Sequence, residues 1–207
     1  MIRDKRCKKC RRAGERLFLR GERCLSNKCA MVKRNYPPGI HGQKGYPRLS
    51  GYALHLKEKQ KVKNIYGIGE RQLRRYMNQS LRKRGNTAEM FQQILERRFD
   101  NIIFRLGLAK SRTQARQLIS HRHLTINQRK VGIPSYLLKT GDETDVVDRS
   151  QKNTYFIEAI KGLEKYQTPS WLTIDKKTLK AKVLHLPKGQ ELNLGIQIQL
   201  IVEFYSK

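Results

Sequence analysis

The sequence predicts an α+β fold: an N-terminal metal knuckle and helical domain, followed by a domain in which helices pack on a small, mainly antiparallel sheet. All four cysteines lie within the first 29 residues, apolar residues recur at helical spacing between Ser50 and Ile119, and short alternating segments follow Leu124. With 207 residues and 38% hydrophobic content, the chain can bury modest cores. The expected domains are 1–48, 49–90 and 91–189, with 190–207 able to pack on the second.

The chain carries 45 Lys and Arg residues against 17 Asp and Glu, a formal net charge of +28. Residues 1–90 hold 25 basic and 6 acidic residues, net +19, and the remainder holds +9. Self-repulsion of this size disfavours a compact state unless a polyanion offsets it, so nucleic acid or an acidic membrane surface is the expected partner. No apolar run exceeds four residues, which excludes a transmembrane helix, and the start lacks a secretion signal. We therefore expect a cytoplasmic protein with no small-molecule substrate.

The cysteines form two pairs, Cys7 with Cys10 and Cys24 with Cys29. This spacing lets four sulfurs face one point, as in a tetrahedral zinc site with no position left open for water. Flanking Lys and Arg residues offset the charge of the thiolates. We expect a structural zinc ion, with an iron–sulfur cluster on the same cysteines as the alternative. Two disulfides are disfavoured because the cytosol is reducing.

Residues 36–48 contain three prolines and three glycines, which excludes regular structure and predicts an extended loop. His41 in this loop and His55 beyond it could bind metal. Because four thiolates are already present, hydrogen bonding or RNA contact is the favoured interpretation for both histidines.

Two basic helices are predicted over 50–66 and 69–84. In the first, Lys57 and Lys61 lie four residues apart on one face, and Gly67 ends the helix. In the second, the apolar stripe is narrow and consists of Leu73, Tyr76, Met77 and Leu81. The other positions are mostly Arg and Lys. A charged helix face is often only solvated, but beside a net charge of +28 phosphate contact is favoured.

The strongest helical periodicity lies between Asn86 and Leu106, and it predicts one core helix closed by Gly107. Ser111 to Gln114 form the capping box of a further helix. Because backbone N–H groups and cations meet at its start, this end suits a phosphate.

The C-terminal half predicts mainly short strands. The segments 124–126 and 131–133 form a hairpin around a basic turn, and a helix is expected over 150–163. The last segment, 196–205, fits either a strand or a helix. Further strands are expected near 136–138, 145–147, 171–174 and 183–186.

A resemblance adds to this interpretation. The run Arg98-Phe99-Asp100-Asn101, the segment 105–119, Asn127, Pro134-Ser135 and Gly141-Asp142 together resemble the S4 RNA-binding domain. The four cysteines, the segment 37–42 and the terminal residues 203–207 extend the resemblance to the S4 family of bacterial small-subunit ribosomal proteins. It covers nearly the whole chain. One departure is the Asn127-Gln128 turn, where the family usually has Asn-Gly, the pair that a type I′ turn prefers.

The resemblance implies a structural constituent of the small ribosomal subunit. It implies early binding to a junction in the 5′ domain of small-subunit ribosomal RNA, nucleation of subunit assembly, and a position near the messenger RNA entry path beside small-subunit protein five, with influence on translational accuracy. Gln43, Lys44 and Arg48 match the family's basic loop near incoming messenger RNA.

Basic faces and resemblance together give a set of candidate RNA-binding residues. These are Lys44, Arg48, Lys57, Lys61, Arg71, Arg74, Lys110, Ser111, Arg112, Thr113, Arg116, His121, His123, Arg129 and Lys130.

Two other functions remain open at this point. An RNA-modifying enzyme could use the same RNA-binding domain, because Asp100 superficially resembles a catalytic aspartate. However, Asp100 lies in a core-patterned segment, where an ion pair with Arg97 or Arg105 is expected, and no catalytic residue is assigned. A stand-alone RNA quality-control factor would lack the cysteine pairs and the Pro-Pro-Gly loop.

Overall fold

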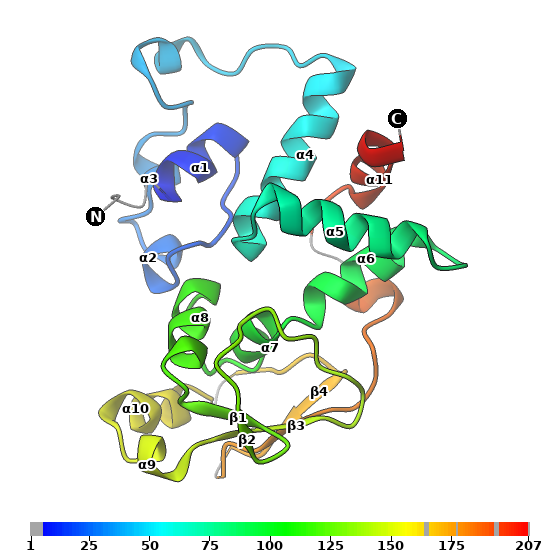
Figure 1. Cartoon of the computed structure of the whole chain (residues 1–207). Coiled ribbons are helices and arrows are strands. Elements are labelled where there is room, and N and C mark those ends of the chain that lie inside the picture. The colour runs from blue at the N-terminus through cyan, green and yellow to red at the C-terminus, as the bar shows by residue number, and fades with distance from the viewer. Residues whose placement is uncertain (1–5, 164–165, 177, 193–194, 207) are drawn as a thin grey trace. The chain divides into compact units, whose positions relative to one another are not determined.

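The N-terminal segment folds into three short helices around the cysteines. The computed structural model describes residues 6–163, 166–176, 178–192 and 195–206. Helices α1 (Arg6–Ala13), α2 (Glu22–Leu25) and α3 (Ala30–Lys33) enclose a small core, whose buried members are Cys10, Ala13, Leu17, Cys29 and Met31. The chain divides into two units, Met1–Ala88 with Gly195–Lys207, and Glu89–Leu194 (Figure 1).

The Pro/Gly segment is more ordered than predicted. Instead of a wholly extended loop it contains a 3-10 turn, η1 (Ile40–Lys44). Gly42 is required there, because a Cβ atom would collide with the backbone oxygen of Pro37. The Arg11 side chain donates to the carbonyl oxygens of Tyr36 and Pro37, at 2.8 and 3.1 Å, and so holds the loop to α1.

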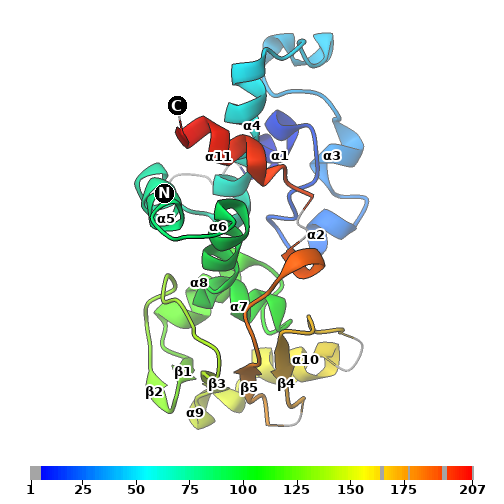
Figure 2. The same ribbon diagram turned by 90° about the vertical axis from the view of Figure 1, so that its right-hand side faces the viewer.

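Both basic helices form close to their predicted bounds. Helix α4 (Gly51–Tyr66) is capped by the hydroxyl of Ser50, which accepts from the Ala53 N–H, and it ends at Gly67 with φ of 59°. Helix α5 (Glu70–Leu81) buries Leu73, Tyr76, Met77 and Ser80, and it stops before the predicted end. The ambiguous C-terminal segment is a helix, α11 (Ile198–Ser206), which packs against α4 and α5 (Figure 2).

The single helix predicted between Asn86 and Leu106 is wrong, because two helices lie there. They are α6 (Thr87–Glu96) and α7 (Phe99–Arg105), and the chain between them is extended at Arg98 (φ −62°, ψ 136°). Residues 97–100 pair like a strand with 134–138, through hydrogen bonds such as Phe99 N–H to Tyr136 O and Leu138 N–H to Arg97 O. At this point the backbone of residues 97–100 pairs with residues 134–138, whereas in the predicted single helix it would bond within the helix. The apolar periodicity is the same in both cases and so did not reveal the break.

Helix α8 (Arg112–Ser120) begins as predicted, with the Ser111 hydroxyl accepting from the Gln114 N–H. The Gln114 side chain accepts from the backbone N–H of Lys110 and not from that of Ser111, so the capping box is shifted by one residue. The predicted helix over 150–163 is two helices, α9 (Asp148–Gln151) and α10 (Thr154–Leu163).

The second unit contains a five-stranded antiparallel sheet. Its order is β2-β1-β3-β5-β4, and a 3-10 turn, η2 (Gly189–Leu192), follows it. The strands are β1 (Leu124–Ile126), β2 (Arg129–Lys130), β3 (Glu143–Val146), β4 (Leu172–Ile174) and β5 (Ala181–Val183). Figure 2 shows α7 and α8 on one side of the sheet. Alternate strand residues such as Leu124, Ile126 and Val146 are buried in a core that also contains Phe99, Ile103 and Trp171. Two predicted strands are wrong: 131–133 is not a strand, because β2 lies two residues earlier, and 136–138 makes only one bridge.

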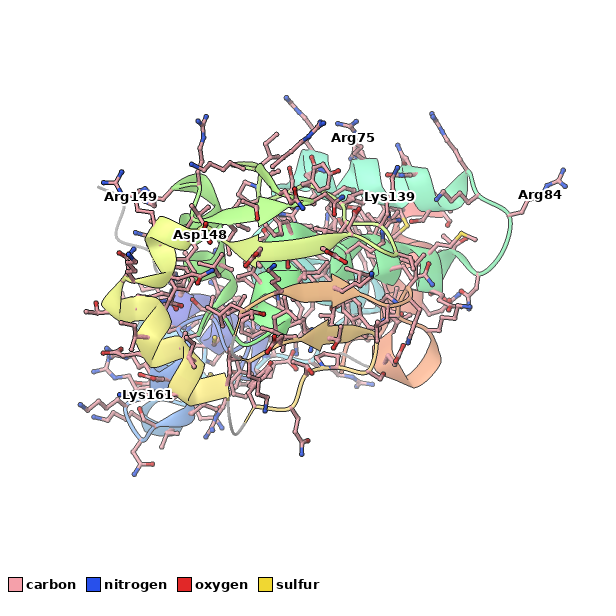
Figure 3. All side chains as sticks on the ribbon, turned by 90° about the horizontal axis from the view of Figure 1, so that it is seen from below. Arg75, Arg84, Lys139, Asp148, Arg149 and Lys161 are labelled. Carbon is pink, nitrogen blue, oxygen red and sulfur yellow. The ribbon has the colours of Figure 1, made fainter. Side chains whose placement is uncertain are left out.

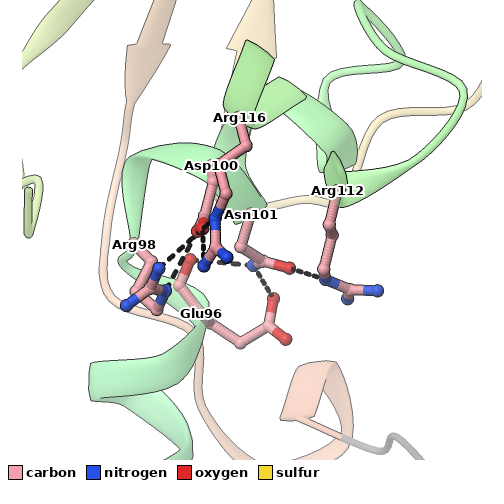
Figure 4. Close-up of polar contacts among 6 residues, drawn as sticks. All are labelled: Glu96, Arg98, Asp100, Asn101, Arg112 and Arg116. Carbon is pink, nitrogen blue, oxygen red and sulfur yellow. Dashed lines mark hydrogen bonds and ion pairs between the residues drawn. The ribbon is translucent and has the colours of Figure 1, made fainter. Parts of the chain in front are cut away.

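Charged side chains mostly extend from the surface, as Arg75, Arg84 and Lys161 do in Figure 3. Seven polar residues are an exception and form a network inside the second unit; Figure 4 shows six of them, and the seventh is Arg105. Arg98 and Asp100, with side chains 2% and 1% exposed, form a bidentate pair at 3.0 and 2.6 Å. Arg116 donates Nε and Nη2 to the same carboxylate at 3.0 and 2.9 Å.

The second half of the network centres on the buried Glu96. Its carboxylate accepts from Asn101 Nδ2 at 2.8 Å and from Arg105 at 3.0 and 3.1 Å. The Asn101 side-chain oxygen accepts from Arg112 Nε at 2.8 Å (Figure 4). The expected partners of Asp100, Arg97 and Arg105, are therefore wrong. Every buried side-chain nitrogen and oxygen of the described residues has a hydrogen-bond partner.

None of the helices that the structure describes is long and apolar enough to cross a membrane.

Removing the charge of Asp100 tests the network. In Asp100→Asn, the buried Arg98 loses the carboxylate with which it pairs, so the free energy of unfolding should fall by about 3–5 kcal/mol in urea denaturation. The control is Glu143→Gln, which removes an exposed ion pair with Lys182 and should change stability by no more than about 0.5 kcal/mol. Equal effects of the two changes would contradict a central role for Asp100.

The hairpin turn offers a stabilising change. Asn127 (φ 48°) and Gln128 (φ 65°) are both left-handed, as a two-residue type I′ turn requires. Asn127 is held by Asp142 and by the Glu143 N–H, whereas Gln128 has no such support in the described structure. Gln128→Gly should therefore raise the free energy of unfolding by up to about 1 kcal/mol in thermal or urea denaturation. A lower stability would show that the turn is not strained.

Candidate nucleic-acid interface

Several of the cations in the first unit are already paired within the protein. Lys61, a predicted RNA contact, is buried, and its ammonium lies 2.8 Å from Glu15 and 2.9 Å from Glu58. Burial alone would lower the pKa of Lys61, but the hydrogen bonds to the two carboxylates outweigh it and raise the pKa. Lys61 is therefore a structural cation and not an available RNA contact, whereas Lys57, on the same helix, is half-exposed.

Glu70 forms ion pairs with two more cations of the first unit. Its carboxylate accepts from Lys59 at 3.0 Å, from Lys63 at 2.9 Å and from the Tyr205 hydroxyl at 2.7 Å. Burial would raise the pKa of Glu70, but these three hydrogen bonds outweigh it and lower the pKa to about 2. The Lys59 ammonium also lies 4.2 Å from the centre of the Phe204 ring. This cluster fixes α11 to α4 and α5.

The outward face of α5, in contrast, carries cations that are not paired with any carboxylate of the described residues. Arg71 and Arg74 are exposed there, as predicted contacts should be, and they line a surface cavity of about 650 Å³. The complete lining is Arg71, Arg74, Arg75, Asn78, Gln79, Arg82 and Lys83. We call this cavity the α5 groove; it holds five cations and no carboxylate.

In the second unit, the predicted cations on α8 are partly used for folding. Arg116 pairs with Asp100, and Arg112 donates to Asn101 while its guanidinium lies 4.5 Å from the centre of the Phe104 ring. Ser111 is buried as the helix cap, whereas Lys110 and Thr113 are exposed at the same end. The start of α8 thus presents a fixed rather than a flexible basic surface.

The hairpin and the Pro/Gly loop carry the other candidates. Arg129 and Lys130 are exposed, although they lie in strand β2 and not at the turn tip. His121 is exposed, whereas His123 is half-buried, with Nδ1 2.9 Å from the Ser150 hydroxyl. In the first unit, Lys44 and Arg48 are exposed in and after η1.

The two histidines that were weighed as metal ligands lie elsewhere. His55 is placed by Gly51 and Glu203, with Nδ1 2.8 Å from the Gly51 carbonyl oxygen and Nε2 3.0 Å from the Glu203 carboxylate. His41 is exposed in η1.

The four cysteines lie in one neighbourhood and are not joined by disulfides. Burial raises the pKa of the Cys10 thiol, a hydrogen bond with the Leu17 backbone opposes this, and Cys24, Cys7 and Cys29 raise it further. The sulfur of Cys24 accepts from the Arg20 N–H at 3.3 Å. No group of three or more His, Cys, Asp or Glu residues is drawn together tightly enough to hold a metal ion among the described residues.

A cavity of about 510 Å³ opens beside the half-exposed Cys7. It is lined, besides Cys7 and Ala30, by the cations Lys8, Arg11, Arg23, Lys28, Lys33 and Arg34. Basic residues therefore lie beside the Cys7 thiol in space as well as in sequence.

The RNA-binding residues predicted from the sequence omit five residues of the α5 groove. They are Arg75, Asn78, Gln79, Arg82 and Lys83. Together with Arg71 and Arg74, these residues recur every three or four positions along the chain. This is the spacing of one helix face, and it lies opposite the buried stripe of α5. This periodicity was the signal that could have identified them.

Comparisons with known proteins give the family. The chain matches the "Ribosomal protein S4/S9 N-terminal domain" over residues 2–96 and the "S4 domain" over residues 97–143. It is 48% identical over 201 residues to small ribosomal subunit protein uS4 of Geobacter metallireducens, covering 97% of this chain and 96% of that protein. Proteins of the same name from Thermus thermophilus and Syntrophobacter fumaroxidans are each 46% identical, covering 97% and 99% of this chain and 96% and 98% of those proteins.

Similarity of this extent runs through both units, the cysteine pairs and the sheet, and it agrees with the fold and the basic surfaces described above. The chain therefore belongs to the uS4 family of small ribosomal subunit proteins.

Proposed function

We propose that this chain is a structural constituent of the small ribosomal subunit that binds small-subunit ribosomal RNA. The observation that carries the proposal is its similarity, over almost its whole length, to small ribosomal subunit proteins. The family is a structural one, so the protein is not an enzyme, and Asp100 acts as a buried partner for two arginines. The protein works in the cytoplasm, on the ribosome.

The basic surfaces support recognition of RNA by backbone and shape. Exposed cations lie in the α5 groove, on the β2 strand and at the start of α8; most are on a helix or strand, whereas Arg82 and Lys83 directly follow α5 and Lys110 precedes α8. Rigid cations at fixed spacing suit the phosphates of a folded junction, which position a protein without reading sequence. We assign this binding to a junction in the 5′ domain, where it nucleates subunit assembly.

Two finer assignments concern the first unit. Lys44 and Arg48, on a loop held by Arg11, are suited to messenger RNA near its entry path, with an effect on translational accuracy. Leu49, Tyr52 and Leu54 are exposed by 36%, 67% and 44% at the start of α4. An apolar surface of this kind suits a protein rather than RNA, and small-subunit protein five is the proposed partner.

The four thiols of the cysteine neighbourhood are the donor set of a structural zinc ion, and binding would have to draw them closer together. The four thiols influence one another electrostatically, N–H groups donate to sulfur, and surrounding cations offset the charge of four thiolates. Cys7, Cys10, Cys24 and Cys29 would hold the metal, which would cross-link α1, α2 and α3. An iron–sulfur cluster uses the same ligands and is the alternative outcome of the metal test.

Salt dependence tests RNA binding. If about ten cations meet phosphates, the logarithm of affinity for full-length small-subunit ribosomal RNA should fall with the logarithm of salt concentration with a slope of roughly −7 to −9. Replacing Arg129 and Lys130 with Ala should make the slope less negative by roughly 0.7–0.9 for each phosphate that the variant no longer neutralises. The control, Lys152→Ala with Lys161→Ala, changes two exposed cations outside the candidate set and should leave the slope unchanged. A wild-type slope near −2 would contradict extensive phosphate binding.

Metal titration tests the thiol site. Because the pKa of Cys10 is raised, its sulfur is protonated in the metal-free protein at neutral pH, so binding zinc must release protons. One zinc per chain, measurable proton release in weak buffer and a higher melting temperature are expected, and Cys24→Ser should reduce all three. Elemental analysis distinguishes zinc from iron. A folded protein that binds neither metal would disprove the site.

A further inference from the structure

The α5 groove differs from the other cationic surfaces in having side chains of two kinds in a fixed order. Arg71, Arg74 and Arg75 lie at one end, Arg82 and Lys83 at the other, and the amides of Asn78 and Gln79 lie between them. At 1.5 Å rise per residue, the two cationic ends lie about 12 Å apart along the helix. The opposite face of α5 is buried through Leu73, Tyr76 and Met77, which prevents the helix from rotating.

The charges of this groove are not compensated within the protein. In the part of the chain that the structure describes, none of its seven side chains has a hydrogen bond or an ion pair. By contrast, Lys59, Lys61, Lys63, Arg98 and Arg116 are all paired with carboxylates. Arg71 lies three and four residues before Arg74 and Arg75, and like charges at these helical spacings repel one another. An external anion would relieve this repulsion at both ends.

The two amides are not explained by phosphate binding alone. An amide carries both a donor and an acceptor, and this combination matches the edge of a base, where Asn and Gln form paired hydrogen bonds. Cations at the ends and amides in the middle therefore follow the order of phosphate, base and phosphate along a strand. The groove, of about 650 Å³, is open to solvent, so a bound nucleotide would lie along the protein surface and would not be enclosed.

We propose that the α5 groove binds one unpaired nucleotide of the ribosomal RNA and reads its base. Asn78 and Gln79 hydrogen-bond the base edge, and the cations at the two ends bind phosphates of the strand on either side of it. We take the nucleotide to be unpaired, because side chains cannot reach base edges in the deep, narrow major groove of an A-form helix, and because sequence-specific RNA recognition mostly targets unstacked bases in loops and bulges. This inference rests on the proposed RNA binding and adds a sequence-specific contact to it.

The test separates the two kinds of side chain in the full-length protein. Binding to transcribed full-length small-subunit ribosomal RNA is measured at several salt concentrations, together with interference by base-edge nucleotide analogues. Asn78→Ala with Gln79→Ala should weaken binding about 10-fold or more, leave the salt slope unchanged, and abolish interference at one unpaired position. Arg74→Ala with Arg75→Ala should make the slope less negative by roughly 1.4–1.8 and leave that interference in place.

The control variant is Gln199→Ala, which removes another exposed helical amide and should change neither the slope nor the interference map. Circular dichroism confirms folding of each variant, and Ala favours the helix at both amide positions. An interference map that the amide variant leaves unchanged would overturn base reading. Failure of the wild-type chain to prefer small-subunit over large-subunit ribosomal RNA would instead overturn the proposed function itself.

Discussion

The carboxylate of Asp100, buried between Arg98 and Arg116, is the interaction on which the second unit depends. It accepts four hydrogen bonds from two guanidinium groups at distances of 2.6–3.0 Å. To make this pair, the backbone at Arg98 must leave the helical conformation, which separates α6 from α7 and lets residues 97–100 pair with 134–138. A buried pair gives little net stability, but it specifies one arrangement strongly, because either charge alone would be very costly to bury.

The same network determines which cations are available for RNA. Arg116 and Arg112 reach inward to Asp100 and Asn101, so α8 is fixed in place by side chains that its own sequence pattern suggests should point outward. In the first unit, Glu70 and Glu58 hold Lys59, Lys61 and Lys63 in a comparable way. The net charge of +28 is thus divided between structural cations, paired with the few carboxylates, and cations that face outward.

This division of the cations separates those that stabilise the fold from those that remain available to bind ribosomal RNA. Because these cations lie mostly on rigid helices and strands, little backbone has to be ordered when they meet phosphate, and mainly the side chains lose freedom on binding. The α5 groove shows this most clearly, because the apolar stripe that buries one face of the helix is what presents Arg71, Arg74 and the two amides on the other. The cysteine neighbourhood would provide the same rigidity to the N-terminal segment, whose core is otherwise very small.

Local patterns in the sequence determined much of this protein. Helical periodicity located α4, α5 and α8, Ser111 marked the cap of α8, and alternation located the hairpin and most strands, because each of these depends on neighbouring residues. Charge and motifs indicated an RNA-binding protein and its family. Only the tertiary structure showed where the segment 86–106 divides into two helices and that the C-terminal segment is a helix. It also showed that Lys61 is buried and that Arg75, Asn78 and Gln79 share a groove with Arg82. These features depend on partners distant in the chain, such as Glu15 for Lys61 and the 134–138 segment for Arg98, which no local pattern contains.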